Sequence, residues 1–207
     1  MFVVVHKGRV VLGPMGWKQK YFTDVLKIRH NTKVDVPGAA PEVLPLAIGE
    51  NTAIHRVIIN QPEIDTAVEY LYGPIWDLSS DTVVANYEIR DLSVVDARNN
   101  FRTIAATERY KKEIAGFKLV VKDTEVFIDT SRESRTIFVQ KVLSMEDYDV
   151  VNWKFAEGWI SLSKKDLIYI VSELNKYIQA AFDWEKLVNT EIDSATNKEQ
   201  LKSISMS

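Results

Sequence analysis

The chain has 207 residues, of which 46% are apolar and 27% are charged, a composition typical of globular proteins. It contains no cysteine, which excludes disulfides, thiolate metal sites and cysteine nucleophiles. The formal net charge is -3 without any concentrated basic stretch, so nucleic acid is not an expected partner, and the apolar run at 1–5 is too short for a signal peptide or a membrane span.

Valine-rich runs open the chain. The runs at 2–5 and 9–12 predict a β-hairpin, and Gly13-Pro14 is expected to end its second strand. Over 17–30 the apolar residues recur mostly at spacings of three and four, which predicts a short helix.

Prolines, which interrupt helices and strands, are frequent in the next segment. Residues 31–50 contain Pro37, Pro41 and Pro45, and this density predicts an extended loop or arm. Strand-like runs follow at 54–59, 68–78 and 82–90. A turn is expected at 79–81, and Gly73-Pro74 marks its strand as an edge strand or a bulge, because proline cannot donate a hydrogen bond to a central ladder.

Four Ser or Thr residues are each followed three positions later by an acid, the spacing of a capping box that begins a helix. The pairs are Ser93/Asp96, Thr130/Glu133, Ser163/Asp166 and Thr196/Glu199. Glutamate reaches back to the capping amide better than aspartate does, which favours the second and fourth pairs. The helices are expected at about 94–115, 131–146, 164–190 and 197–204, with Gly116 as a left-handed cap of the first.

Alternating apolar and polar residues predict two hairpins between these helices. The first turns at Asp123-Thr124 and the second at 156–158. Hairpin then helix therefore occurs twice, over 117–146 and 149–190, although the two copies share no obvious sequence identity. The helix expected at 164–190 carries an apolar stripe, which favours packing within the domain over pairing with a second copy; its residues are Leu167, Val171, Leu174, Ile178 and Ala181.

These elements predict an α+β fold in two parts. Residues 1–92 form a mostly antiparallel β region with one short helix, interpreted as an attachment region that carries the proline-rich arm at 31–50. Residues 93–207 form a domain made of a helix followed by two hairpin-helix units.

Candidate reactive groups do not gather into a known pattern. His6, His30 and His55 lie in separate segments without the spacing of metal ligands. Ser161 and Lys164 spell Ser-x-x-Lys, but Ser161 ends a predicted strand and the partner motifs of that catalytic class do not occur. We expect a protein that is not an enzyme and that uses no metal or cofactor.

An acidic hairpin leaves one alternative open. Asp123, Glu125 and Asp129 resemble the carboxylate clusters of metal-dependent nucleases, but Phe127 stands where a lysine is expected, and Asp129 precedes a helix start, where a negative charge already has a structural use. A small metal-dependent hydrolase is therefore a minor hypothesis.

Tryptophan is the residue type that most favours an interface. Trp17 and Trp76 each follow a turn containing Gly-Pro, and a projecting tryptophan near a proline-rich arm is typical of protein contacts, although burial explains both positions equally well. The candidate interface residues are Trp17, Trp76, Pro37, Pro41 and Trp184. Trp153 and Trp159 flank a tight hairpin and are expected in the core.

Residues from about 90 to 205 resemble a domain of unknown function found in virion and tail-region proteins of tailed bacteriophages. The motifs that carry the resemblance are Arg109-Tyr110-Lys111, Gly116-Phe117, Asp129-Thr130-Ser131-Arg132, Val151-Asn152-Trp153-Lys154, Gly158-Trp159, and Ala181-Phe182 with Glu185. Gly13-Pro14 and Gly73-Pro74-Ile75-Trp76 also look like the N-terminal region of phage tail proteins.

The resemblance implies a structural protein of the virion, in the tail, baseplate or fibre attachment point, made in the host cytoplasm. Its expected partners are other tail or baseplate proteins and copies of itself, because such parts are repeated by symmetry, and neither nucleic acid nor membrane is expected. The mechanism would be docking, with the arm at 31–50 ordering on a neighbour. The alternative is a tail fibre assembly chaperone.

Overall fold

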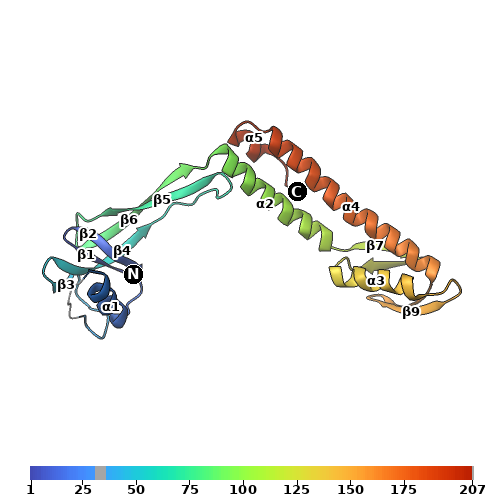
Figure 1. Cartoon of the computed structure of the whole chain (residues 1–207), viewed down its shortest axis with the longest axis horizontal. Coiled ribbons are helices and arrows are strands. Elements are labelled where there is room, and N and C mark those ends of the chain that lie inside the picture. The colour runs from blue at the N-terminus through green and yellow to red at the C-terminus, as the bar shows by residue number, and fades with distance from the viewer. Residues whose placement is uncertain (31–35, 207) are drawn as a thin grey trace. The chain divides into compact units, whose positions relative to one another are not determined.

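The computed structural model describes residues 1–30 and 36–206. The chain forms two compact units, Met1–Leu92 and Ser93–Ser207, and each has a hydrophobic core of its own (Figure 1). Strands dominate the first unit and helices the second, which confirms the predicted α+β class.

One mixed six-stranded sheet forms the first unit. Its strands are β1 (Phe2–His6), β2 (Arg9–Met15), β3 (Leu46–Gly49), β4 (Thr52–Asn60), β5 (Glu69–Asp77) and β6 (Thr82–Asp91), and α1 (Gln19–His30) accompanies them. The strand order is β2-β1-β4-β6-β5, and β3 pairs with β4. All pairs are antiparallel except β4 with β6, so the region is mostly antiparallel, as predicted.

Both edge strands on this path contain a Gly-Pro pair. Gly73-Pro74 lies in β5, where the pairing register with β6 shifts, which confirms the predicted edge strand with a bulge. The prediction that Gly13-Pro14 ends a strand is wrong, because β2 continues to Met15. The pairing of β2 with β1 shifts in register between Phe2 and Val4. Gly13 lies at this shift with a φ of 99°, and a Cβ there would lie 2.6 Å from the Phe2 carbonyl oxygen, so the position requires a residue without a side chain.

Successive residues of β1 point to opposite sides of the sheet and enter two different cores. Val4 belongs to the core that contains the fully buried Phe22 of α1 and Ile54 of β4. Val3 belongs to the other core, whose fully or almost fully buried members are Val3, Val57, Val83 and Ala85. Phe22 therefore places α1 over one side of the sheet.

The loop predicted at 31–50 is only partly irregular. Residues 31–35 lie outside the described part of the chain. Val36 is buried in the core under α1, and Gln19 Nε2 donates a hydrogen bond to its carbonyl oxygen at 2.7 Å. Leu46–Gly49 forms β3 against β4, so the prediction of an unbroken loop is wrong. Pro45 is the last proline of this segment, and the residues after it form a strand.

The second unit contains four helices and two hairpins. Its elements are α2 (Val94–Ile114), β7 (Phe117–Val121), β8 (Thr124–Ile128), α3 (Arg132–Ser144), β9 (Val150–Phe155), β10 (Gly158–Ser163), α4 (Lys164–Ser194) and α5 (Lys198–Ser203). Helices α2 and α4 lie side by side and antiparallel (Figure 1). Polar contacts join them along their length, from Arg98 Nη2 donating to the Ala195 carbonyl at 2.6 Å to Tyr177 Oη donating to the Lys112 carbonyl at 2.9 Å.

Backbone conformation fixes the first of the two hairpins. Lys122 and Asp123 have φ of 50° and 63°, which gives a two-residue turn one position earlier than the predicted Asp123-Thr124. Gly116 has a φ of 75°, as a left-handed cap requires, and a Cβ at this position would collide with the ring of Phe127. The change of direction between α2 and β7 therefore depends on a glycine.

Two helices begin where the capping pattern places them. The Ser93 side chain accepts a hydrogen bond from the Asp96 amide at the start of α2. At the start of α4, Ser163 and Asp166 form a complete capping box, with the Ser163 amide donating to Asp166 Oδ2 at 2.8 Å. Both helix starts have aspartate as the acid, which was expected to reach less well, and only the one at α4 forms the complete box.

The other two helices begin one residue later than predicted. The capping residues are Ser131 for α3 and Asn197 for α5, in place of Thr130 and Thr196. Thr130 is fully buried, and its hydroxyl accepts a hydrogen bond from the Gly116 amide at 3.0 Å, so it ties the end of α2 to the start of α3 instead of capping a helix.

The core of the second unit lies between the two hairpins, α3 and the first half of α4. Leu162, Leu167 and Ile170 are fully buried there, and the ring of Phe138 stacks on Trp153 with centroids 4.5 Å apart. The buried residues of α4 continue along its length through Leu174, Ala181, Val188 and Ile192. The apolar stripe of this helix is thus used within the unit, as the favoured interpretation of its spacing predicts.

Candidate functional site

Trp17 and Trp76, for which projection and burial were equally favoured, are both half-buried. Trp17 is half-buried beside the α1 core, with its ring centroid 5.4 Å from that of Phe2 and 5.3 Å from that of Phe22. Trp76 is half-buried against the other core of the first unit. A tryptophan after a tight turn can fold back onto its own sheet, and here the packing gain outweighs exposure.

The remaining candidate interface residues are scattered. Pro37 is exposed and Pro41 is half-exposed in the segment before β3. Trp184 lies in the other unit, on α4, and Lys112 Nζ of α2 lies 4.7 Å from its ring centroid. Of the five candidates, four therefore lie in the first unit, and Trp184 lies in the second.

A different tryptophan is exposed. In the hairpin of β9 and β10, one face points into the core, while five residues of the other face are exposed; these are Val150, Asn152, Lys154, Trp159 and Ser161, called here the hairpin face. Trp159 is 69% exposed and Val150 is 65% exposed. The prediction that Trp159 lies in the core is wrong. The strand register explains the error, because Trp159 pairs with the exposed Lys154, whereas Trp153 points to the opposite side.

The segment that leads into this hairpin is also apolar and exposed. Leu143 at the end of α3 is 80% exposed, and Tyr148 just before β9 is 85% exposed. Phe127, on the outward side of the other hairpin, is 43% exposed. Large apolar side chains are normally removed from water, and their concentration at the hairpin end of this unit is typical of a surface that contacts another protein.

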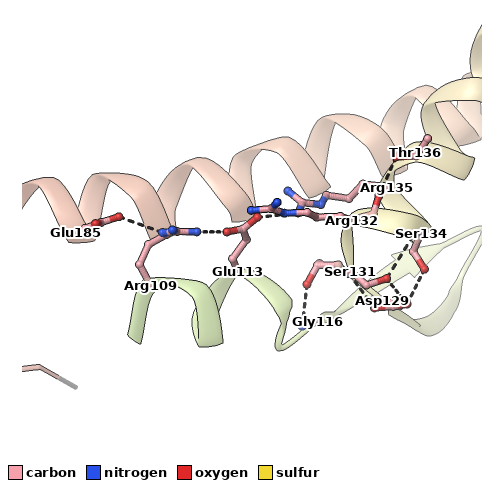
Figure 2. Close-up of polar contacts among 11 residues, drawn as sticks. Arg109, Glu113, Gly116, Asp129, Ser131, Arg132, Ser134, Arg135, Thr136 and Glu185 are labelled. Carbon is pink, nitrogen blue, oxygen red and sulfur yellow. Dashed lines mark hydrogen bonds and ion pairs between the residues drawn. The ribbon is translucent and has the colours of Figure 1, made fainter. Parts of the chain in front are cut away.

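A chain of charged side chains connects α2, α3 and α4 (Figure 2). Glu113 is 2% exposed and pairs with both Arg109 and Arg135, the latter at 2.6 Å, and Arg109 also pairs with Glu185 at 3.0 Å. Burial alone raises the pKa of Glu113, but the hydrogen bonds and positive charges of Arg135 and Arg109 outweigh it and hold the pKa below its ordinary value. The four groups alternate in sign, so each buried charge has a partner.

The acidic residues of the nuclease hypothesis each have a different neighbour. The carboxylate of Asp129 accepts hydrogen bonds from the Ser134 hydroxyl at 2.5 Å and the Ser131 amide at 2.9 Å, and these bonds lower its pKa (Figure 2). Glu125 pairs with Lys118 at 2.7 Å, and Asp123 lies in the turn. Within residues 1–30 and 36–206, no group of three or more His, Cys, Asp and Glu side chains is placed to hold a metal ion.

His6, Ser161 and Lys164 also have polar partners within their own units. His6 Nδ1 lies 2.7 Å from Thr52 Oγ1. The hydroxyl of Ser161 donates to Asn152 Oδ1 at 2.6 Å, and Lys164 pairs with Asp147 at 3.0 Å. The Ser-x-x-Lys pattern therefore spans the end of β10 and the start of α4, with its serine and lysine bonded to different residues.

Among the described residues, no helix is long and apolar enough to cross a membrane. No curated protein and no solved structure matches the chain. Residues 96–205 match a protein family described as "Domain of unknown function (DUF4376)". The match starts within α2, ends after α5, and so contains both hairpins, the Glu113 network and the hairpin face. Because it covers more than half of the 207 residues, the chain belongs to the DUF4376 family.

Proposed function

We propose that this protein is a non-enzymatic structural component of a tailed-bacteriophage virion, in the tail, baseplate or fibre attachment point, and that it acts by docking through the hairpin face. The observation that carries the docking proposal is Trp159, which is 69% exposed in β10, next to the turn of the hairpin. Tryptophan contributes large contact areas and is enriched among the residues that dominate binding energy. The phage assignment is supported by the sequence motifs that resemble virion and tail-region proteins.

The proposed partners are other tail or baseplate proteins and copies of this chain. Tail parts are repeated around a symmetry axis, and a repeated part must present the same surface in every copy. The hairpin face combines aromatic, aliphatic and polar side chains, with Lys154 Nζ 5.9 Å from the Trp159 ring centroid. This mixture suits an interface that forms from separately folded proteins, since a wholly apolar face would aggregate before assembly. Synthesis in the host cytoplasm followed by incorporation into the tail region completes the proposal.

Mass spectrometry of purified virions tests this proposal. In particles of a phage that encodes the chain, we expect copies in a fixed ratio to other tail proteins. Trp159→Ser is expected to lower the incorporated amount strongly, because it removes the proposed anchor without touching the core. The control is Tyr110→Ser, which removes another exposed aromatic side chain, 44% exposed on α2, and should leave incorporation unchanged.

Two results would contradict the structural role. If the chain is absent from finished particles but fibres fail to assemble without it, the protein is a fibre assembly chaperone. If purified protein cleaves nucleic acid with magnesium or manganese and loses that activity when Asp123 and Glu125 are replaced, the protein is an enzyme. Equal incorporation of Trp159→Ser and the wild type would refute the hairpin face as the docking surface.

A further inference from the structure

A second surface of the DUF4376 unit has the properties of a binding groove. It is an open depression of about 580 Å³ between α2, α3 and α4, and its lining includes Glu113, Arg135, Val139 and Phe182. The volume is in the range of grooves that hold a small ligand or a few residues of a peptide. The α3 residues that line it are spaced three, one, three and one apart and so lie on one side of the helix; they are Arg132, Arg135, Thr136, Val139 and Gln140.

The charges beneath this groove are already balanced. Glu185, Arg109, Glu113 and Arg135 alternate in sign, and both carboxylate oxygens of Glu113 are occupied, Oε2 by Arg109 and Oε1 by Arg135. Arg132 stands outside this set. It is exposed at the groove, and no ion pair or hydrogen bond of its guanidinium group is found among the described residues. Arg132 therefore adds one positive charge that the folded unit does not use.

A second observation is an unpaired hydrogen-bond donor at the same place. Arg135 Nε is buried and has no acceptor among the described residues, although its Nη2 donates to Glu113 at 2.6 Å. Buried donors are nearly always paired, so an additional acceptor beside Arg135 would be favourable. The unpaired charge of Arg132 and this free donor together favour one negatively charged acceptor in the groove.

The apolar wall restricts what can carry that charge. Val139 is 41% exposed and Phe182 is 43% exposed, and one side of the Phe182 ring is occupied by the Arg109 guanidinium at 4.6 Å. A ligand that satisfies the groove therefore combines a single negative charge with an apolar group. Nucleic acid fits poorly, because its phosphates bring repeated negative charge toward Glu113 and Glu185 and it has few apolar groups to cover the wall.

We propose that this groove binds a segment of another protein in which a carboxylate side chain stands close to an aliphatic or aromatic one. Arg132 holds the carboxylate, Val139 and Phe182 contact the apolar side chain, and Thr136 and Gln140 bond to the backbone of the segment. A guanidinium group suits this role because its planar donors match the two oxygens of a carboxylate. The inference rests on the proposal that the chain acts by docking, and adds to the hairpin face a second site with its own chemistry.

The test uses the purified full-length chain and an array of short peptides in which acidic, basic, aliphatic and aromatic residues vary independently. We expect the bound peptides to contain Asp or Glu close to an aliphatic or aromatic residue. Binding to the best peptide, measured by fluorescence polarisation, should weaken about tenfold or more in Arg132→Glu. The matched control is Lys186→Glu, which makes the same charge change at an exposed cation of α4 outside the groove and should bind as the wild type does.

A second variant, Val139→Thr, keeps the size of the side chain and places a hydroxyl in the apolar wall. It should weaken binding while the thermal unfolding of the protein, followed by circular dichroism, stays close to that of the wild type. The proposal would be overturned if the chain bound no peptide or selected basic or neutral ones. It would also be overturned if Lys186→Glu weakened binding as much as Arg132→Glu does, or if a single-stranded oligonucleotide competed more strongly than the peptide. If the chain binds the peptide through Arg132 but is absent from virions, the groove proposal stands and only the virion role is refuted.

Discussion

At the scale of single residues, Glu113 illustrates how a buried charge becomes part of the fold. Replacing it by glutamine removes the negative charge between two arginines that are 16% and 19% exposed, so that Arg135 loses its ion pair and Arg109 keeps only the one with Glu185. Breaking a buried pair in this way costs about 3 kcal/mol, so we expect Glu113→Gln to lower the free energy of unfolding by roughly that amount in urea titrations. Glu125→Gln breaks an exposed pair and should cost less than about 1 kcal/mol. Equal losses of unfolding free energy in Glu113→Gln and Glu125→Gln would contradict the larger contribution expected of the buried network.

The same carboxylate predicts a dependence of stability on pH. The pKa of Glu113 is lower in the folded chain than its ordinary value of 4.5, so the stabilisation it provides is present above that value and is lost as the pH falls through the lowered pKa. Between about pH 5 and pH 2, the unfolding free energy of the wild type should therefore fall more steeply than that of Glu113→Gln. Parallel curves for the two proteins would contradict the assignment.

Gly116 carries a different kind of residue-scale constraint. Alanine at this position combines a left-handed backbone with a collision against Phe127, and it should lower the free energy of unfolding by about 2 kcal/mol or more. Gly8→Ala is the comparison, because Gly8 has nearly the same φ, 74°, but a Cβ there meets no atom within 4 Å. The difference between the two losses, measured by thermal unfolding, reports the collision alone.

At the scale of elements, the start of α4 depends on its capping box. Ser163→Ala removes the acceptor for the Asp166 amide and should lower stability by about 1 kcal/mol. Ser161→Ala serves as the control two residues earlier in the same strand, where the serine hydroxyl bonds only to the exposed Asn152. A loss for Ser161→Ala as large as that for Ser163→Ala would refute the special role of the cap.

Helices and strands could be predicted where the sequence pattern that indicates them is local. The alternation of residues in the two hairpins and the stripe on α4 are local patterns, and the structure confirms both. The capping residue of α3 was misplaced because the choice between Thr130 and Ser131 is decided by the Gly116 amide, which is distant in sequence. The β4–β6 pairing is parallel and joins segments separated by β5, so no short-range pattern could have indicated it.

The candidate surfaces depended even more on tertiary contacts. The exposure of Trp159 follows from its pairing with Lys154, and a careful reading of the hairpin register could have found it. Arg109 and Glu113 are four residues apart on one helix, a spacing that suggests a pair, but nothing local indicates that Arg135 and Glu185 complete the network. The groove beside Arg132 is formed by three helices, and no single segment could have predicted it.

At the scale of the whole molecule, the two compact units predict that the second can fold alone. A fragment of residues 93–207 keeps the core of α3, α4 and both hairpins, as well as the α2–α4 contacts. We expect it to give a helical circular dichroism spectrum and a cooperative thermal transition close to the corresponding transition of the full chain. A disordered fragment would show that Met1–Leu92 is needed for folding.

The Gly-Pro pairs of the sheet have a consequence for a protein that is crowded beside its own copies. Unpaired strands at both margins of a sheet can recruit identical strands and grow into fibrous deposits. Pro14 in β2 and Pro74 in β5 each remove an amide donor from such a margin, and Gly73 adds an offset in pairing next to Pro74. The chain can thus be held at high local concentration through side-chain contacts while backbone-driven polymerisation is discouraged.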